Sequence, residues 1–237
     1  MSFWIRAFLA LVWFLGACLL AVPLCVLRWG DLRNVHDIGR MMAFGILPLA
    51  RVRVEVEGGQ WLGPEHQPCV YVGNHQSGFD VPLFGRFCPN RIIAVGKKEL
   101  KWVPFFNLAW MGSGNVSIDR GNRIKAVAGL EDVVRAIRGK GASVVIFPEG
   151  TRNRQGGDLL PFKKGAFHMA IAAQVPVVPI VLSPVTRVLD FKARRLGGTM
   201  RVKVLPPVST QGLTRDDVDA LTQKVRGQMV EAFRSLA

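Results

Sequence analysis

A run of 21 residues without a charge, between Arg6 and Arg28, constrains this chain more than any other feature. As a helix that rises about 1.5 Å per residue, the run reaches across a hydrocarbon core of about 30 Å. It is longer than the core of a signal peptide, about 7–15 residues, and Pro23-Leu24-Cys25-Val26 offers no small-x-small cleavage site. The run therefore predicts a retained membrane-associated helix, which Pro23 should kink or end.

A second apolar stretch, MMAFGILPLA at 41–50, is too short to span a bilayer and follows a link that carries Arg28, Arg33 and Arg40. Two arrangements stay open: a single spanning helix, or a helical hairpin that dips into one leaflet with these arginines at the headgroups. We favour the hairpin. The chain then divides into a membrane-associated segment, 1–50, and a folded domain, 51–237.

From residue 51 the chain alternates short β-rich runs with helical patterns, which is typical of an α/β domain. We expect a mixed, largely parallel sheet of about seven strands flanked by helices. The strand candidates are 52–56, 69–72, 92–95, 116–118, 143–147, 177–182 and 202–205. The clearest helix begins near Asn122 and leaves Gly139 beyond its end, and the last helix begins at Thr214 as its N-cap.

The charge balance predicts a negatively charged partner. The chain has 31 Lys and Arg against 17 Asp and Glu, a formal charge of +14. A phosphate-bearing ligand, an anionic lipid surface or nucleic acid would all fit, but no nucleic-acid-binding module is present. The 49% of apolar residues exclude intrinsic disorder. The four cysteines form no C-x-x-C pair, so we expect neither a zinc site nor a disulfide scaffold, and we expect a reducing compartment.

The densest group of unusual residues is the octapeptide at 73–80, GNHQSGFD, which follows a predicted strand. His75 and Asp80 would not share a face of a regular helix, since five residues turn through about 500°. In an irregular strand-to-helix turn, however, Asp80 can reach back to the imidazole. A carboxylate on one ring nitrogen leaves the other free to accept a proton, as in a general base and its orienting group.

Three further blocks follow in order, and each lies at the end or start of a predicted strand. They are GNVSIDR at 114–120, FPEGTR at 147–152 and VPVVPI at 175–180. The two prolines of the last block favour an edge or strand-end position. Each block alone is a common turn with solvated charges, but their joint order after the His-x4-Asp pair is improbable by chance.

In this combination the sequence resembles the glycerolipid acyltransferase family, and most closely the bacterial 1-acyl-sn-glycerol-3-phosphate (lysophosphatidic acid) acyltransferases. The resemblance covers 70–184 and includes GKKEL at 96–100 and LPFKKGAF at 160–167. It implies an acyltransferase domain over 51–237, an N-terminal membrane-binding element, and acyl transfer from acyl-CoA or acyl-carrier protein to the sn-2 hydroxyl of lysophosphatidic acid. Family members usually carry an apolar or aromatic residue where Ser117 stands, which affects packing rather than chemistry.

The resemblance and the chemistry together assign roles. A thioester is already activated, so a neutral imidazole, with an ordinary pKa near about 6.5, suffices as base. His75 and Asp80 are the catalytic candidates. Arg120, Arg152 and Lys97 are expected at the substrate phosphate. Glu149 should bond the glycerol hydroxyl or orient Arg152, while Gly150 and Thr151 complete the substrate-binding turn.

Backbone N–H groups at the helix start after Asp80, or in the Glu149–Thr151 turn, are candidates for the oxyanion site. No cofactor is expected, because the acyl donor is a substrate. Residues 151–200 hold eight Lys and Arg against two Asp, and this group could face an anionic phospholipid bilayer, the phosphates of coenzyme A or an acidic carrier protein. We expect a bacterial inner membrane protein whose catalytic domain faces the cytoplasm.

Three alternatives stay open at this point. The acceptor could be another lysolipid, such as lyso-ornithine lipid. The chain could be a lipid hydrolase that uses Cys69 or a serine, or a non-catalytic phospholipid-binding protein. Acyl-chain preference, oligomeric state and the aromatic cluster around Trp102, Phe105, Phe106 and Trp110, either core or acyl-chain tunnel, do not follow from the sequence.

Overall fold

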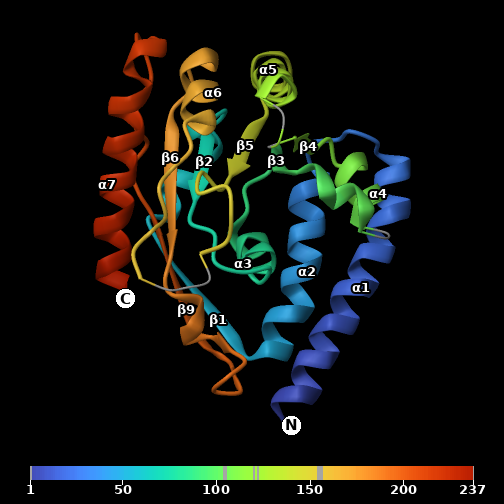
Figure 1. Ribbon diagram of the computed structural model, residues 1–237. Coiled ribbons are helices and arrows are strands. Elements are labelled where there is room, and N and C mark those ends of the chain that lie inside the picture. Colours follow the sequence, from blue (N-terminus) through green and yellow to red (C-terminus); the bar gives the residue numbers. More distant parts are fainter. Residues whose placement is uncertain (1, 104–105, 120, 122, 154–156, 237) are drawn as a thin grey trace.

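Seven strands form one sheet at the centre of the computed structural model, which describes residues 2–103, 106–119, 121, 123–153 and 157–236 (Figure 1). Their order is β1-β9-β6-β2-β5-β3-β4, and every neighbouring pair is parallel except β6 and β9. The bounds are β1 Val52–Glu57, β2 Val70–Gly73, β3 Ile92–Lys97, β4 Val116–Ile118, β5 Ser143–Ile146, β6 Val177–Leu182 and β9 Gly198–Val204. The expected α/β fold with a largely parallel sheet is confirmed.

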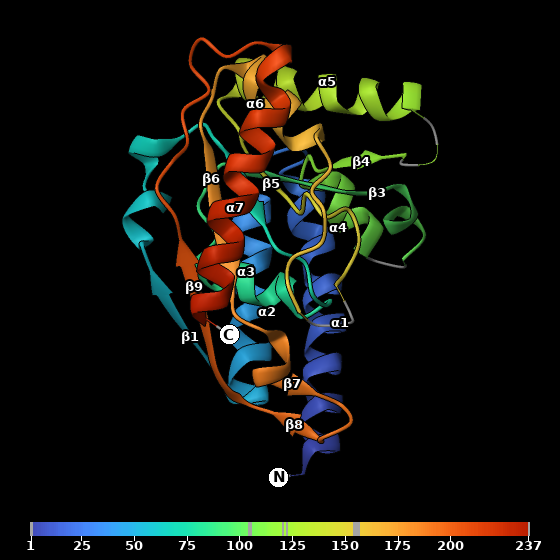
Figure 2. The ribbon, with the colours of Figure 1, turned by 60° about the vertical axis from the view of Figure 1, so that its left-hand side comes forward.

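Helices cover both faces of the sheet (Figures 1 and 2). On one face, α5, α6 and α7 share a core with β2, β3 and β4. On the other, α2 and α3 bury their apolar residues against the sheet, and α1 packs outside, against α2 and α4. The bounds are α1 Phe3–Leu27, α2 Asn34–Ala50, α3 Asp80–Phe87, α4 Phe106–Gly112, α5 Arg123–Lys140, α6 Gly165–Ala173 and α7 Val218–Leu236.

The sequence pattern of the last helix is confirmed. Thr214 caps a short 3-10 turn that leads into α7, and its side chain and that of Asp217 form a reciprocal capping box. The apolar positions that repeat along α7 are all buried, and they are Val218, Leu221, Val225, Met229 and Phe233. The stripe therefore serves core packing.

Two predicted helix ends were wrong. Of the two effects predicted for Pro23, an end of the helix was wrong, since α1 continues to Leu27 with Cys25 buried against α4, its Sγ 3.6 Å from the Ala109 carbonyl; a kink at Pro23 stays a prediction. Helix α5 includes Gly139 and ends at Lys140, and the left-handed residue beyond it is Gly141, with φ of 61°. Glycine is tolerated inside an exposed helix at a cost of about 1 kcal/mol, so Gly139 did not have to mark the end.

The edge position expected for the proline-rich strand was also wrong, since β6 lies in the interior of the sheet, between β9 and β2. Pro179 has no N–H to donate, but this leaves no gap in the sheet's hydrogen bonds because the pairing of β6 with β9 begins only at Ile180. The Pro179 carbonyl accepts the N–H of Leu205, one residue beyond β9, and its missing donor faces the end of that strand. Pro179 therefore lies at a strand end only with respect to the pairing with β9; its pairing with β2 continues on both sides.

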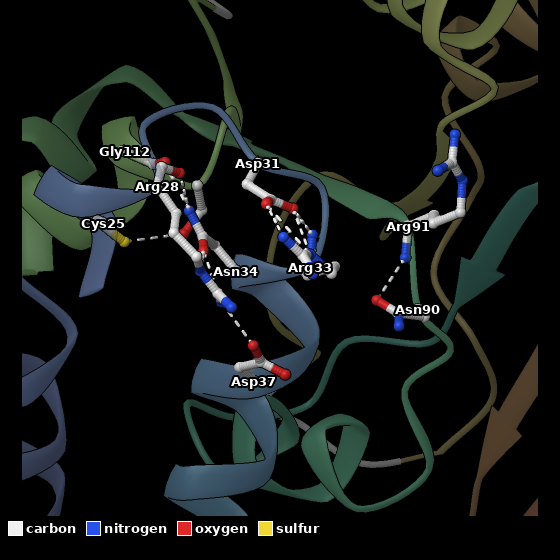
Figure 3. A network of polar contacts seen from close by, with 10 residues as sticks. Cys25, Arg28, Asp31, Arg33, Asn34, Asp37, Asn90, Arg91 and Gly112 are labelled. Carbon is white, nitrogen blue, oxygen red and sulfur yellow. Dashed lines mark hydrogen bonds and ion pairs between the residues drawn. The ribbon is translucent and has the colours of Figure 1, made fainter.

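The connection between α1 and α2 is tied to α4 by buried polar groups (Figure 3). Asn34 is fully buried, and its amide nitrogen donates to the carbonyls of Arg28, at 2.7 Å, and Gly112, at 3.0 Å. The guanidinium of Arg28 donates to Asn34 Oδ1 and to the Asp37 carboxylate. These bonds join the turn to α2 and to α4, so α1 and α2 form a fixed helical hairpin.

Sequence reasoning missed a two-stranded antiparallel hairpin, β7 (Leu189–Asp190) and β8 (Arg195–Leu196), that lies apart from the main sheet. Short 3-10 turns complete the described structure. They are Gly59–Leu62, Pro64–His66, Lys98–Trp102, Val185–Arg187 and Arg215–Asp217. Among the described residues, α1 is the one helix whose length and composition would allow it to cross a membrane.

Candidate functional site

The site begins where β2 leaves the sheet. Gly73 ends the strand, and a Cβ there would lie 2.8 Å from the Phe84 ring, so any side chain at this point would have to displace that ring. The buried amide of Asn74 donates to the Leu182 carbonyl and accepts the Leu182 N–H, which joins the turn to the end of β6. These contacts place His75 in the irregular turn that the sequence predicts.

Asp80, the first residue of α3, reaches back to His75. Its Oδ2 lies 2.7 Å from His75 Nδ1 and also accepts the backbone N–H groups of Gln76, at 2.7 Å, and Ser77, at 3.0 Å. Asp80 is completely buried, whereas the His75 side chain is about one-fifth exposed. An ionised carboxylate at this position requires the proton on Nδ1, which leaves Nε2 as the basic nitrogen.

The imidazole is fixed from a second side by an aromatic ring. The rings of His75 and Phe147 stack with centroids 4.2 Å apart and an interplanar angle of 12°. Phe147 packs edge-on against Phe84 of α3. With one nitrogen bound by Asp80 and one face covered by Phe147, the ring has a single orientation.

Glu149 binds the backbone around His75. One carboxylate oxygen accepts the His75 N–H at 2.8 Å, and the other accepts the Leu160 N–H at 3.1 Å. Burial raises the pKa of Glu149, which the two N–H donors oppose. Sequence reasoning expected Glu149 at a glycerol hydroxyl or on Arg152. Among the described residues each oxygen accepts one backbone N–H and neither contacts Arg152, and the contact with a glycerol hydroxyl stays a prediction.

Helix α7 supports the same segment from outside. Arg226 donates to the carbonyls of Leu159, at 2.7 Å, and Leu160, at 3.3 Å, and Arg234 pairs with Asp158. The Asp158 carbonyl accepts from the side chain of Asn153, whose backbone N–H donates to the His75 carbonyl at 2.8 Å. The backbone N–H and C=O of His75 are therefore both held by groups that α7 anchors.

A cavity of about 810 Å³ opens beside His75, a size within the usual range for small-ligand pockets. Its polar lining gathers where neighbouring strands β2, β5 and β3 end, the edge at which ligands bind in parallel sheets. Apart from Ser113 and Asn115, which precede β4, the rest of its lining is chiefly apolar and comes mostly from α2, α3, β3 and α4, including Ile38, Met42, Val81, Phe84, Ala94, Phe106, Ala109 and Trp110.

The cavity brings together most of the residues predicted for the site. His75, Lys97, Gly150, Thr151 and Arg152 line it. Asp80 and Glu149 lie behind that lining, against His75. Arg120 lies outside the described residues, as does Phe105 of the aromatic cluster. Within that cluster, Phe106 and Trp110 line the cavity, while Trp102 is exposed.

Several residues of the site were missed by sequence reasoning. The Gln76 amide donates to the Ser183 carbonyl at 3.0 Å and accepts the Val185 N–H at 2.9 Å, so it repeats the clamp made by Asn74. A phenylalanine at a strand end and an arginine in a helix are both common, so the residue types of Phe147 and Arg226 do not indicate a role in the site. Ser117, the departure from the family pattern, accepts the indole N–H of Trp110 at 3.0 Å and thereby fixes one wall of the cavity.

Cys69, the alternative cysteine nucleophile, is buried, and so is Cys88. Burial raises the pKa of Cys69 to about 11 and that of Cys88 to about 12. A thiol with so high a pKa carries almost no thiolate at neutral pH. Among the described residues, no three His, Cys, Asp or Glu side chains are grouped closely enough to hold a metal ion.

Comparisons with known proteins agree on one relationship. Residues 53–183 match the family model described as Acyltransferase. The chain is 41% identical to human 1-acyl-sn-glycerol-3-phosphate acyltransferase alpha, over 95% of this chain and 79% of that protein. It is 36% identical to the 1-acyl-sn-glycerol-3-phosphate acyltransferase of Haemophilus influenzae, over 90% and 88%, and 33% identical to that of Escherichia coli K12, over 98% and 93%.

A solved structure shares the fold. The crystal structure of the 1-acyl-sn-glycerophosphate (LPA) acyltransferase from Thermotoga maritima superposes with a TM-score of 0.74, covering 99% of this chain and 98% of that one. The two sequences are 21% identical. The likeness extends to the N-terminal helices as well as the sheet, since nearly the whole of both chains is covered.

Proposed function

Because the chain belongs to the acyltransferase family, we propose that it transfers a fatty acyl group to the sn-2 hydroxyl of 1-acyl-sn-glycerol-3-phosphate and so makes phosphatidic acid. The relatives named for this reaction match almost the whole chain. The observation that carries the proposal is the cavity, in which an oriented imidazole, two cationic side chains and a long apolar wall line one space. A phosphorylated lysolipid needs all three.

In the proposed reaction His75 is the general base. Nε2 takes the proton of the sn-2 hydroxyl as its oxygen attacks the thioester carbonyl carbon. The carbon–sulfur bond then breaks, and the donor thiolate leaves and takes up the proton from the imidazolium. Asp80, 2.7 Å from Nδ1, stabilises the imidazolium while it exists.

The cations of the cavity suit the phosphate of the acceptor. Lys97 ends β3 and Arg152 follows β5, and these strands are neighbours in the sheet. A guanidinium presents a bidentate fork to phosphate oxygens, and an ammonium adds a point charge. We assign Arg120 to the same phosphate on the family resemblance.

We assign Glu149 a positioning role rather than a contact with substrate. Its carboxylate joins the backbone of His75 to that of Leu160. Of the two oxyanion candidates, the turn at 149–151 is favoured. The N–H groups of Asp80 and Val81 already donate to the carbonyls of Ser77 and Gly78, whereas the Thr151 N–H makes no bond among the described residues.

The apolar part of the cavity suits the acyl chain of the donor, and either acyl-CoA or acyl-carrier protein could deliver it. Both donors are made in the cytoplasm. The proposed site of action is therefore the cytoplasmic face of a bacterial inner membrane.

For membrane attachment we propose that α1 and α2 lie in one leaflet. The catalytic domain contacts α1 near both ends: at Arg6, which donates to the Leu196 carbonyl, and at Cys25, which lies against Ala109 and Ser113. Those contacts are about 28 Å apart along the helix. A helix perpendicular to the bilayer would draw polar loops of the domain into the hydrocarbon core at one of these ends, which is costly.

The proposal is tested by supplying the purified full-length protein with labelled acyl-CoA or acyl-carrier protein and a panel of lysolipids. We expect transfer to 1-acyl-sn-glycerol-3-phosphate, lost by about 10²–10⁴ in rate with His75→Ala. His36→Ala, at a half-buried histidine of α2 that bonds the Cys88 carbonyl, is the matched control and should retain activity. Preference for lyso-ornithine lipid, or acyl release that depends on Cys69, would contradict the assignment.

A further inference from the structure

The β7–β8 hairpin has no part in the proposed chemistry, yet it lies at the N-terminal end of α1 (Figure 2). Its turn holds Phe191, which is 60% exposed and forms an edge-on contact with Phe3 at 5.7 Å between centroids. Arg6 of α1 donates to the carbonyl of Leu196, at the other end of the hairpin. The hairpin is therefore attached to the helix at two points.

The hairpin is also anchored to the end of α2. Its last residue is followed by Gly197, with φ of 140°, and a Cβ at this position would lie 3.3 Å from the carbonyl oxygens of Ala50 and Arg51. A side chain there would be crowded by α2 and strained by the positive φ. The open end of the α1–α2 hairpin and the β7–β8 hairpin thus form one rigid corner of the molecule.

This corner is strongly cationic. Arg187, Lys192, Arg194 and Arg195 are exposed, and none of them forms an ion pair within the part of the chain that the structure describes. The nearby acid, Asp190, uses its Oδ1 to accept the backbone N–H groups of Lys192 and Ala193. The Asp190 carboxylate forms no ion pair with any of the four among the described residues, so four exposed cations stand against the single acid of the hairpin.

The cationic corner continues an apolar surface. Along α1 the outward side chains are large and exposed, and they include Trp4, Ile5, Phe8, Leu11, Val12, Leu15, Leu19 and Leu20. Phe191 contacts Phe3 at the start of this helix, and the exposed Lys192 and Arg194 follow Phe191 in the turn. An exposed aromatic ring among arginines, next to an apolar helix, matches the boundary between acyl chains and anionic headgroups. An acidic protein would complement the charge but not the row of apolar side chains.

We propose that the β7–β8 hairpin is a second membrane contact, in which Phe191 enters the headgroup boundary and Arg187, Lys192, Arg194 and Arg195 bind anionic phospholipid. The contact rests on the proposed placement of α1 in one leaflet. It fixes the N-terminal end of α1 and the catalytic domain at one depth, as the Asn34 network fixes the other end. The occupant is a bilayer surface with anionic headgroups.

An environment-sensitive dye on Ala193→Cys tests the depth of the hairpin, with Phe191 and the cations unchanged. Ala193 is exposed and the four native cysteines are buried, so labelling is selective. On vesicles of phosphatidylcholine with phosphatidylglycerol we expect a blue-shifted emission, quenched by nitroxide lipids labelled near the headgroup. The same dye on Gln211→Cys should do neither, because this exposed residue belongs to the loop between β9 and α7, which reaches the end of the ribbon opposite β7 and β8 in Figure 2. Equal spectra at the two positions would overturn the proposal.

A charge-matched pair of variants tests the headgroup contact. Lys192→Gln with Arg194→Gln should lower partitioning of the full-length protein onto anionic vesicles roughly thirtyfold and leave partitioning onto phosphatidylcholine alone unchanged. Arg215→Gln with Lys224→Gln removes two exposed cations of the last helical segment and should have little effect. Equal losses for both pairs would mean that net charge alone matters, and that result would overturn the proposal.

These measurements need no substrate, so they fail independently of the proposed reaction. An inactive enzyme whose hairpin still binds anionic vesicles would refute the reaction and retain the membrane contact. If Lys192→Gln with Arg194→Gln impaired transfer from acyl-carrier protein alone, with vesicle binding unchanged, the corner would be a carrier-protein site and the proposal would be wrong.

Discussion

Asp80 owes its position to three donors that converge on one oxygen. His75 Nδ1 and the N–H groups of Gln76 and Ser77 all lie within 3.0 Å of Oδ2. In a buried site a carboxylate so bound cannot turn away, and its charge acts at short range on the imidazole. A five-residue spacing that no helix could use is thereby converted into a direct contact.

The first prediction separates this charge from the geometry. In Asp80→Asn the amide oxygen can still accept the N–H groups, so the thermal unfolding midpoint should change little. The imidazolium loses its counter-charge, and kcat should fall by about 10²–10⁴ with KM nearly unchanged. Steady-state kinetics and a thermal melt check both parts, with Asp132→Asn, at an exposed carboxylate of α5, as control. A kcat within threefold of wild type would contradict the role of Asp80.

The second prediction concerns the thiols. With pKa values of about 11 for Cys69 and about 12 for Cys88, the native protein should keep its transfer activity after incubation with iodoacetamide at pH 8. Raised values favour the protonated thiol in the folded state. That contribution to stability is present below the ordinary thiol pKa near 9 and is lost as pH rises toward 11. Mass spectrometry should show four alkylated cysteines after unfolding, and rapid inactivation of native protein would instead favour a cysteine nucleophile.

Residue types carry only part of such a site. His75 and Asp80 stand out in the sequence because imidazole and carboxylate are rare next to a buried strand. Glu149 stands out as well, but its partners are backbone N–H groups, and backbone groups have no sequence signal. Gln76 clamps Ser183 and Val185 across more than 100 residues, so its role depends on which strands become neighbours.

At the scale of elements, α7 and the segment before α6 act as one support. The third prediction is that Arg226→Met, which keeps the apolar stem and removes the donors to Leu159 and Leu160, lowers the free energy of unfolding by about 1.5–3 kcal/mol. It should also lower kcat more than it changes KM. The Glu149 carboxylate is hydrogen-bonded to the backbone N–H groups of both Leu160 and His75, so a shift of Leu160 would move the catalytic histidine.

Arg226→Lys restores one donor and should recover part of kcat, which a loss of packing alone would not explain. Lys224→Met changes an exposed position of the same helix and should match wild type. Chemical denaturation and steady-state kinetics measure the two effects. Equal kinetics for Arg226→Met and Lys224→Met would show that the link from α7 to His75 carries no energy.

The fourth prediction concerns β3 and the apolar wall. Ala94 lines the cavity, and a phenylalanine there would fill part of it. Ala94→Phe should lower kcat/KM for long-chain acyl donors about tenfold more than for short-chain donors, and Ala94→Val should shift the same ratio less. A mixture of acyl-CoA lengths, with products resolved by mass spectrometry, gives the ratio directly. A uniform loss at all lengths would mean that the acyl chain lies elsewhere.

A helix or strand can be predicted from the sequence where the local residue types alone determine it. The strands were predicted to within a few residues because β-branched runs between turns have little alternative. The predictions from Pro179 and Gly139 failed because the effect of each residue depends on its neighbours in the fold. Pro179 is tolerated inside the sheet because the pairing with β9 stops there, and Gly141 rather than Gly139 adopts the left-handed conformation that follows α5. Hairpin β7–β8, with two residues in each strand, is too short for any periodicity to indicate.

For the molecule as a whole, the order of the strands in the sheet determines which side chains come together in the site. Strands β2, β5 and β3 are far apart in the sequence but adjacent in the sheet, and their carboxyl ends carry His75, Arg152 and Lys97. An α/β class can be predicted from alternation, but the strand order requires long-range packing that no local pattern encodes. Only the family resemblance tied those residues to one substrate in advance.

The boundary predicted at residue 50 separates a membrane segment from a catalytic domain, and the packing makes it testable. Ala43, Leu47 and Ala50 of α2 share one buried cluster with Leu83 of α3 and Met200 of β9. Leu47 and the other large buried residues of α2 (Ile38, Met42 and Ile46) each contribute about 1.5–3 kcal/mol when fully buried. Leu47 lies in the cluster shared with the sheet, whereas Ile38, Met42 and Ile46 lie in the cluster that α2 forms with α1 and α4, so α2 packs against the domain and against α1 at once.

The fifth prediction is that a chain that begins at Arg51 does not fold cooperatively in detergent, whereas a chain that lacks only Met1 and Ser2 does. Removal of α1 and α2 would uncover one face of the sheet and the apolar lining that α2 gives the cavity. Circular dichroism should then show no sharp thermal transition for the shorter chain, and transfer activity should be absent. A cooperative melt near that of the full chain would show instead that 51–237 is an independent domain, and that α2 serves the membrane rather than the core.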